Sequence, residues 1–256
     1  MGRPKAWLPW RGVPMLEHVV SVLHEVVDEI VVVTSASLDP PPVRARIVRD
    51  SREGWGPLAG IAEGLAHVEA DLVFVTSTDA PFLSSAFVHA LFSYESAVAP
   101  EIDGFVQSLA AVYPRSGLDC AERLLSEGRR RPLDLLETVG YRKLEASALP
   151  DLDSVRGLNT ADAYLAAVAR DQGAARACLE FVGHARQLAQ CEQIEVPVGR
   201  LFEVLAAAPG AMEICRDECV VAPFLVSLGG RDFVRDGRVP IGPGERVIVL
   251  DSSGGG

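Results

Sequence analysis

The chain has 256 residues, of which 48% are hydrophobic and 23% are charged, a composition typical of one large globular domain or two ordinary ones. The formal net charge of −11 argues against general binding to nucleic acid or to an anionic membrane. No apolar run approaches the ~18–20 residues of a membrane span, and the N-terminus lacks the profile of a signal peptide.

The first part of the chain alternates helical and extended patterns. Apolar residues at helical spacing predict helices over 14–29 and Gly60–His67. Buried strands are predicted at Glu29–Thr34, Arg46–Asp50 and Asp71–Thr76. Strands that alternate with helices of this size favour βαβ units and a parallel sheet.

The pattern is looser after residue 100. Phe105–Val112 alternates like a strand, and helices are expected at Leu118–Ser126 and Pro132–Val139. Thr160 is a suitable N-cap for a further helix. That helix frays into Arg170–Ala175, where we place a domain boundary.

The last eighty or so residues have the element order of a β-grasp domain. Strands and one amphipathic helix are expected at Ala177–Val182, Ile194–Val196, Arg200–Ala207 (the helix), Leu225–Leu228 and Arg246–Leu250. The predicted fold class is therefore α/β. A Rossmann-like sheet with flanking helices (1–172) would be followed by a small, ubiquitin-like α+β domain (176–256).

The five cysteines are odd in number and scattered, which suits a reducing, cytoplasmic location better than a disulfide framework. Cys215 and Cys219 stand four apart and could share a helix face. Because no second ligand pair accompanies them, two buried or half-buried thiols are expected in place of a zinc site.

Three loops that follow predicted strands carry the candidate chemistry, and such loops line the crevice of an open α/β sheet. Asp50 precedes the glycine-rich run Gly54–Ile61, where backbone can approach a flat ligand and helix N–H groups favour anions. Asp79, before a proline turn, is placed to hold Mg²⁺ against phosphate oxygens. The amide oxygen of Asn159 could complete that metal site.

Lys5 is the fourth candidate. Among 24 cationic side chains only Lys5 and Lys143 are lysines. A compact ammonium on a flexible stem can follow phosphate oxygens through a reaction, which a planar guanidinium does less well.

In this order, these residues resemble the molybdenum cofactor guanylyltransferases (MobA type), over roughly residues 1–168. The resemblance implies that Lys5 contacts the nucleotide phosphates and that Asp79 binds Mg²⁺ and the triphosphate, so that both are catalytic, with Asn159 as a second metal ligand. It also implies a nucleotide-binding set that recognises base and ribose: Thr34, Asp50, Gly56, Pro57, Leu58 and Gly60.

The chain departs from that family in two places. Of the first strand and the glycine-rich loop only Met1–Lys5 remains, so we expect a domain that lacks both, with a start site placed too late as the favoured explanation. Thr34 stands where guanine-specific members tend to carry Asn, which leaves guanine and cytosine both open. Two regions are expected to face the pterin phosphate, or else to be a polar strand residue and a solvated basic turn: Gln107, before Leu109 and Tyr113, and Gly128–Pro132.

The C-terminal part, Ala177–Gly256, resembles the sulfur-carrier subunit of molybdopterin synthase (MoaD type). Matching features include Phe181, Val196–Pro197 and the glycine end Gly254–Gly256. The resemblance implies that Gly255 or Gly256 is adenylated by an ATP-dependent activating enzyme and becomes a thiocarboxylate. The large synthase subunit would then receive its sulfur.

Together the two resemblances predict a bifunctional molybdenum cofactor protein that uses Mg²⁺, GTP and molybdopterin. The alternatives are a cytidylyltransferase, a non-catalytic carrier or scaffold with a degenerate first domain, and a sulfur carrier for thiamine synthesis.

Overall fold

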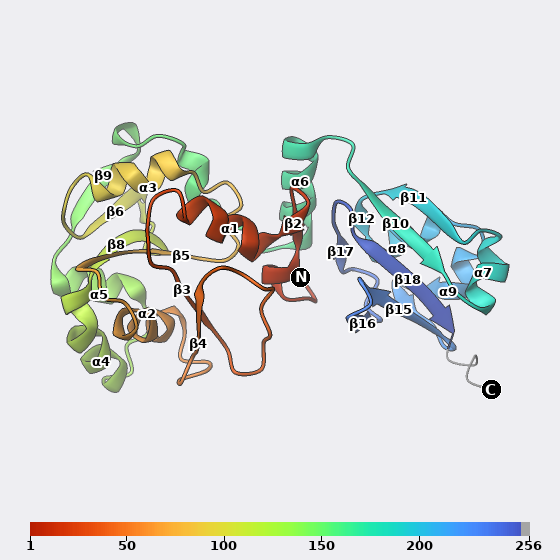
Figure 1. Cartoon of the computed structure of the whole chain (residues 1–256), viewed down its shortest axis with the longest axis horizontal. Coiled ribbons are helices and arrows are strands. Elements are labelled where there is room, and N and C mark those ends of the chain that lie inside the picture. Colours follow the sequence, from red (N-terminus) through yellow and green to blue (C-terminus); the bar gives the residue numbers. More distant parts are fainter. Residues whose placement is uncertain (252–256) are drawn as a thin grey trace. The chain divides into compact units, whose positions relative to one another are not determined.

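The computed structural model describes residues 1–251, which form two compact units (Figure 1). The α/β unit is Leu16–Gly157, and the β-grasp unit combines Met1–Met15 with the chain from Leu158 onward. This grouping differs from the boundary expected near residue 172, because the N-terminal segment and the helix after Asn159 fall in the β-grasp unit. The expected division into sequence modules at 172 and 176 stays a prediction. None of the helices in the described residues is long and apolar enough to cross a membrane.

The α/β unit follows the predicted alternation of strands and helices. Its elements are α1 (Met15–Leu23), β3 (Val31–Thr34), β4 (Arg46–Arg49), α2 (Pro57–Ala66), β5 (Leu72–Thr76), α3 (Ser85–Phe92), β6 (Val98–Ile102), β7 (Phe105–Val106), β8 (Ala110–Pro114), α4 (Leu118–Ser126), α5 (Pro132–Val139) and β9 (Arg142–Glu145).

The strands of this unit form two separate sheets. β3 and β4 pair in parallel, and the other sheet has the order β5-β8-β6-β7, with β9 parallel to β6. The expectation of a parallel sheet is therefore wrong for three of its pairings, because the β5–β8, β8–β6 and β6–β7 ladders are antiparallel. One cause lies in the sequence: Asp103 and Gly104 both adopt positive φ, the backbone of a tight hairpin between β6 and β7.

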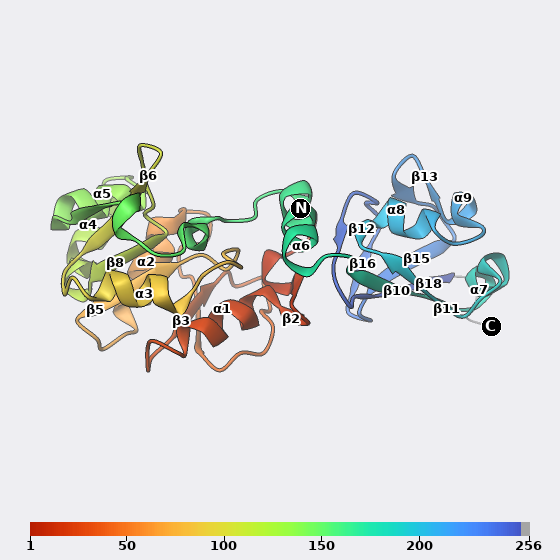
Figure 2. The ribbon, with the colours of Figure 1, turned by 90° about the horizontal axis from the view of Figure 1, so that it is seen from above.

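Helices cover both faces of the larger sheet, as Figure 2 shows. On one face α2, α4 and α5 pack together through side chains such as Leu58, Leu124 and Leu135. On the other face α1 and α3 contribute Val19 and Phe87. This arrangement, with helices on both faces of a sheet, is a three-layer α/β fold.

Local differences from the sequence predictions have simple causes. The strand expected over 105–112 is broken at residues 107–109 by the turn between β7 and β8. Helix α1 ends at Leu23, and α2 begins early because Pro57 occupies its first position after Gly56, whose φ is +85°. Helix α3 and strands β6 and β9 were not predicted.

The β-grasp unit contains a five-stranded sheet of order β11-β10-β18-β15-β16, with β10 and β18 parallel at its centre. Its elements are a 3-10 turn η1 (Lys5–Trp7), β1 (Pro9–Trp10), β2 (Val13–Pro14), α6 (Ala161–Gln172), β10 (Arg176–Phe181), α7 (His184–Ala189), β11 (Gln193–Pro197), β12 (Gly199–Arg200), α8 (Leu201–Ala206), α9 (Ala211–Ile214), β13 (Cys215–Arg216), β14 (Cys219–Val220), β15 (Phe224–Leu228), β16 (Asp232–Val234), β17 (Pro240–Ile241) and β18 (Arg246–Asp251).

Two expectations about the cysteines of this unit are corrected. Cys215 and Cys219 lie on the β13–β14 hairpin and not on a helix, and Cys219 is exposed. Burial raises the pKa of the Cys215 thiol. The glycines expected to carry sulfur, Gly255 and Gly256, lie outside the described residues.

The N-terminal segment, residues 1–15, is held within this unit by buried polar contacts. Arg3 Nη1 lies 2.6 Å from Glu245 Oε1, and both side chains are nearly inaccessible to solvent. The Tyr164 hydroxyl on α6 donates a hydrogen bond of 2.5 Å to the carbonyl of Pro9. These contacts fix the backbone on both sides of Lys5.

Candidate functional site

Asp79 lies in the turn after β5 and is 8% exposed. Gly157 packs directly against it: a Cβ at this glycine would lie 3.5 Å from both carboxylate oxygens. The space beside the carboxylate is therefore kept open by the absence of a side chain. A buried carboxylate at a strand end is suited to binding a cation or a hydrogen-bond donor.

Neighbouring groups hold the turn that carries Asp79. Ser154, in the short turn η4 (Leu152–Val155), is 1% exposed, and its hydroxyl donates to the carbonyl of Phe82 at 3.3 Å. The same hydroxyl accepts a hydrogen bond of 3.2 Å from the backbone N–H of Ser84. The ring of His18 contacts the carbonyl of Pro81, with Nε2 at 2.9 Å. The position of Asp79 is thus set by several elements of the α/β unit.

The structure brings Thr34 and Asp50 together. Because β3 and β4 pair in parallel with Thr34 opposite Arg49, the N–H of Asp50 donates to the carbonyl of Thr34 at 2.8 Å. The Asp50 carboxylate accepts from the N–H of Arg52 at 2.8 Å, which shapes the start of the following loop. The Thr34 hydroxyl faces the carbonyl of Leu38 at 3.5 Å.

The glycine-rich loop leads directly into α2. Gly54 and Gly56 both have positive φ, a conformation that glycine adopts without strain. Pro57 is exposed, Leu58 is fully buried, and Gly60 faces open space. The N-terminus of α2 therefore lies at this loop, and the positive end of a helix dipole favours an anion.

Arg130, from the expected pterin-facing run, lies against the same loop. Its guanidinium stands 5.2 Å from the ring centroid of Trp55, and its Nη1 donates to the carbonyl of Gly54 at 3.5 Å. This basic run is therefore not simply a solvated turn, and one of its arginines belongs to the glycine-rich loop.

The other residues expected to face the pterin phosphate do not contact the glycine-rich loop in any interaction described for them. Gln107 donates from Nε2 to the carbonyl of Phe105 at 3.1 Å, and Leu109 is 37% exposed. Tyr113 is fully buried and donates to the carbonyl of Ser108 at 2.8 Å, so it is a core residue and burial raises its pKa. Arg131 lines a separate hollow of about 450 Å³ together with the exposed ring of Phe105.

Lys5 and Asn159 meet within the β-grasp unit. The ammonium of Lys5 donates to Oδ1 of Asn159 at 2.6 Å. Thr160 caps α6, as expected, by accepting a hydrogen bond of 3.1 Å from the N–H of Ala163. The amide oxygen expected to bind a metal is thus used here to orient an ammonium.

A magnesium site was expected at Asp79 and Asn159. The described residues contain no group of three or more His, Cys, Asp or Glu side chains that could enclose a metal ion. Mg²⁺ is commonly held by only one or two carboxylates together with substrate phosphates, so a single buried carboxylate at Asp79 fits this mode of binding.

Residues 1–142 match the family of MobA-like NTP transferase domains. The chain belongs to this family. It is accordingly a nucleotidyltransferase. A "Probable molybdenum cofactor guanylyltransferase" of Bacillus cereus is 30% identical over 176 residues, which cover 65% of this chain and 88% of the relative.

Solved structures support the fold. Molybdopterin-guanine dinucleotide biosynthesis protein A from Archaeoglobus fulgidus matches with a TM-score of 0.53 and 24% identity, over 63% of this chain and 87% of its own. The 2-C-methyl-D-erythritol 4-phosphate cytidylyltransferase from Thermus thermophilus matches with a TM-score of 0.53 and 20% identity, over 65% and 94%. At these identities the likeness establishes the nucleotidyltransferase fold alone.

Sequence reasoning missed several residues that shape these sites. Ser154 and His18 act through backbone carbonyls, and neither sits in a motif. Arg3 and Glu245 are far apart in sequence and form a pair only through tertiary packing. Gly157 opens the candidate loop that contains Asn159, but its close approach to the carboxylate of Asp79 was not predicted.

Proposed function

We propose that the chain transfers a guanylyl group from GTP to the terminal phosphate of molybdopterin or the molybdenum cofactor, with release of pyrophosphate. The proposal is carried by the alignment to the Bacillus cereus relative, which spans most of that protein. Its supporting chemistry is a buried carboxylate at Asp79, a glycine-rich loop at a helix N-terminus and an oriented ammonium at Lys5.

The residues have distinct roles in this reaction. Nucleotidyl transfer by in-line attack on the α-phosphorus needs alignment and charge neutralisation more than a covalent nucleophile. Lys5 would contact the phosphates, and its partner Asn159 would either orient that ammonium or bind metal. Asp79 would hold Mg²⁺ jointly with phosphate oxygens, and the bound ion would neutralise charge on the triphosphate.

The nucleotide would be recognised at the loop that joins β4 to α2. Asp50, whose N–H bonds to the carbonyl of Thr34, would supply a carboxylate, and Gly56, Pro57, Leu58 and Gly60 would supply backbone. The Thr34 hydroxyl already faces a backbone carbonyl, so base choice would depend more on the loop backbone than on this side chain. On the acceptor side, Arg130 and Arg131 are candidates for the pterin phosphate.

The test is pyrophosphate release from GTP and from CTP with molybdopterin as acceptor. Asp79→Asn is expected to reduce kcat by about 100-fold or more, since it removes the negative charge that binds the cation. Asp119→Asn, on α4, is the matched control and should keep normal turnover. Preference for CTP would instead establish the cytidylyltransferase, and undiminished turnover by Asp79→Asn would contradict the assigned role.

A second activity, sulfur carriage, is favoured by the order of the β-grasp sheet. The central strand β18 ends at Asp251, and Gly254–Gly256 follow it in the sequence. Gly255 or Gly256 would be adenylated by an activating enzyme and converted to a thiocarboxylate for the large subunit of molybdopterin synthase.

Intact mass after incubation with ATP, sulfide and a molybdopterin-type activating enzyme tests this activity. An exchange of one oxygen for sulfur is expected, and deletion of Gly255 and Gly256 should abolish it. An unchanged mass with a proven activating enzyme would contradict the proposal and leave the transferase proposal untouched.

A further inference from the structure

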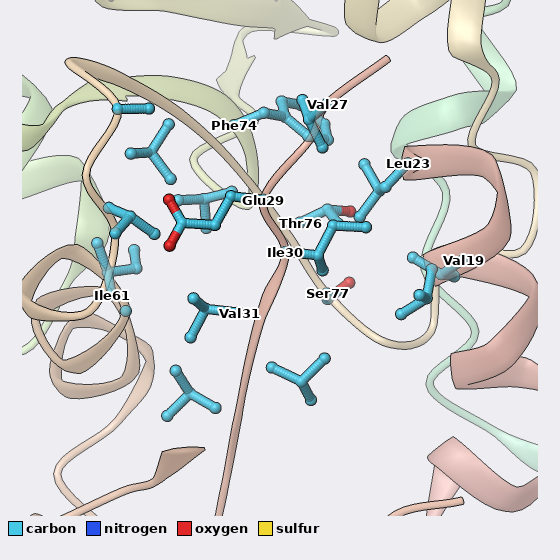
Figure 3. A pocket seen from close by; sticks show the side chains of 18 of the residues that line it. Val19, Leu23, Val27, Glu29, Ile30, Val31, Ile61, Phe74, Thr76 and Ser77 are labelled. Atoms are coloured by element: carbon cyan, nitrogen blue, oxygen red, sulfur yellow. The ribbon is translucent and has the colours of Figure 1, made fainter. Parts of the chain in front are cut away.

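The hollow of about 450 Å³ beside Arg131 lies between the β6–β7 hairpin and the start of α5. We call it the hairpin hollow. Its lining combines two aromatic rings with charged groups of both signs: Phe105, Tyr141, Arg131, Lys143, Glu101 and Glu137. The larger cavity between β3 and β5 has a different chemistry, since Figure 3 shows aliphatic side chains such as Val19, Leu23 and Ile61 around it. A concave site with aromatic rings and a few polar groups is typical of small-molecule binding.

An ion pair borders the hairpin hollow. The parallel pairing of β6 and β9 brings Glu101 and Lys143 together, and the Lys143 ammonium donates to Oε2 of Glu101 at 2.6 Å. The Glu101 side chain is 26% exposed, so a ligand in the hollow can reach it. Because a carboxylate has two oxygens with several lone pairs, Glu101 can accept further hydrogen bonds while it stays paired with Lys143.

The two aromatic rings offer flat apolar surface to a ligand. Phe105 is 73% exposed, although it is a large apolar side chain, and it stands next to the turn of the β6–β7 hairpin. Tyr141, just before β9, is half-buried and packs against the core formed with α2, α4 and α5. Aromatic rings gain free energy by stacking on another flat ring, so this composition favours a planar, ring-shaped ligand.

The hairpin hollow shares a sheet edge with Asp79. Strands β5 and β6 both pair antiparallel with β8, so their carboxyl ends meet at the same edge. Asp79 follows β5 there, and the hairpin follows β6. Ligands of open α/β sheets bind at this kind of edge. Two consecutive arginines connect the places: Arg130 contacts the glycine-rich loop, whereas Arg131 borders the hairpin hollow.

We propose that the hairpin hollow binds the ring system of the acceptor, a 2-amino-4-oxo pteridine, with its phosphate directed toward Arg131. The 2-amino group and the adjacent ring N–H form two parallel donors, and Glu101 accepts hydrogen bonds from them. Phe105 covers one face of the ring. The inference rests on the proposed function for the identity of the acceptor, whereas the recognition itself can be measured without nucleotide.

Guanine has the same donor edge as a pterin, so the experiment must separate the two. The probe is 6-hydroxymethylpterin phosphate, titrated into the full chain without nucleotide and followed by the fluorescence of the pterin. The matched probe is the corresponding lumazine, in which an oxygen replaces the 2-amino group. Its affinity should be at least about tenfold lower, because a carbonyl oxygen then faces the carboxylate. Guanosine monophosphate should also bind more weakly than the pterin.

Three substitutions assign the contacts. Glu101→Gln should remove the preference for pterin over lumazine. Phe105→Leu should weaken pterin binding by about threefold to tenfold, whereas Phe233→Leu, which also removes an exposed ring, should not change it. Arg131→Gln should weaken binding of the phosphorylated pterin at least about fivefold and leave unphosphorylated 6-hydroxymethylpterin unaffected. The exposed position of Phe105 keeps the test decisive if Glu101→Gln fails to fold.

Equal affinity for pterin and lumazine, or an unchanged affinity in Phe105→Leu, would overturn the inference. Tighter binding of guanosine monophosphate that depends on Glu101 would replace it with a site for the nucleotide base. The expected pattern of pterin binding without any pyrophosphate release would contradict the proposed function alone. Turnover of molybdopterin with an acceptor KM that Phe105→Leu leaves unchanged would contradict this inference alone.

Discussion

Replacing Arg3 by methionine is expected to detach the N-terminal segment from the β-grasp unit. The guanidinium of Arg3 lies 2.6 Å from Glu245 and also donates to the carbonyl of Pro240 at 3.3 Å. The other carboxylate oxygen of Glu245 accepts from the N–H of Gly242 at 3.0 Å. The substitution therefore leaves a buried carboxylate with one backbone donor and no cation.

The size of the effect follows from burial. The two side chains are 5% and 7% exposed, so solvent cannot replace the missing partner. Removing one member of such a pair costs about 3–5 kcal/mol, because the remaining charge stays desolvated. Adding Glu245→Gln removes that charge and keeps an acceptor for Gly242, so the double variant should regain more than about 1 kcal/mol.

Urea unfolding followed by tryptophan fluorescence measures this effect. Trp7 and Trp10 lie in the N-terminal segment, and Trp55→Phe removes the remaining tryptophan of the chain. The matched control is Arg238→Met, whose salt bridge with Asp236 is exposed and should contribute little. If Arg3→Met unfolds at the same urea concentration as this control, or the double variant is less stable than Arg3→Met, the assignment of a stabilising buried pair is wrong.

Three further substitutions test separate features. Thr76→Val removes a buried hydroxyl without a described partner and should raise the free energy of unfolding by about 1 kcal/mol, measured in urea; a loss of stability would contradict this. Gly157→Ala places a methyl group 3.5 Å from both oxygens of Asp79 and should slow pyrophosphate release at an unchanged melting temperature. Gly242→Ala would make its new Cβ overlap the Tyr164 hydroxyl and cost about 1–3 kcal/mol in thermal unfolding, a loss that adding Tyr164→Phe should relieve.

The sequence predicted best those features that depend on a single strand or helix. The apolar runs before Thr34 and before Ser77 were correctly predicted as strands, and Thr160 was correctly predicted as a helix cap. The adjacency of Thr34 and Asp50 follows from the parallel pairing of their strands, which the alternation of strands and helices implied. Whether neighbouring strands pair in parallel or antiparallel was harder to predict from the sequence, because antiparallel hairpins depend on short turns such as Asp103–Gly104.

Contacts between residues that lie far apart in the sequence could not be predicted from it. The expected division near residue 172 follows sequence modules, whereas packing groups the N-terminal segment with α6 and the β-grasp strands. The reason is specific: Arg3, Pro9 and Arg11 bond respectively to Glu245, Tyr164 and Asp171. None of these residues belongs to a local motif, so no pattern in the sequence predicts that they pair.

This packing has a consequence for the transferase reaction. Lys5, proposed to contact the nucleotide phosphates, lies between Arg3 and Pro9, and residues of α6 and the β-grasp strands hold both of these neighbours. Loss of the Arg3–Glu245 pair should therefore lower transferase activity although Glu245 belongs to the region that resembles a sulfur carrier. The test compares the rate of pyrophosphate release by Glu245→Gln with the rate by Asp236→Asn, which breaks the exposed Arg238–Asp236 pair. A slower rate for Glu245→Gln alone would show that the transferase reaction depends on the β-grasp unit. Equal rates for the two variants would show that the β-grasp strands are not needed to position Lys5.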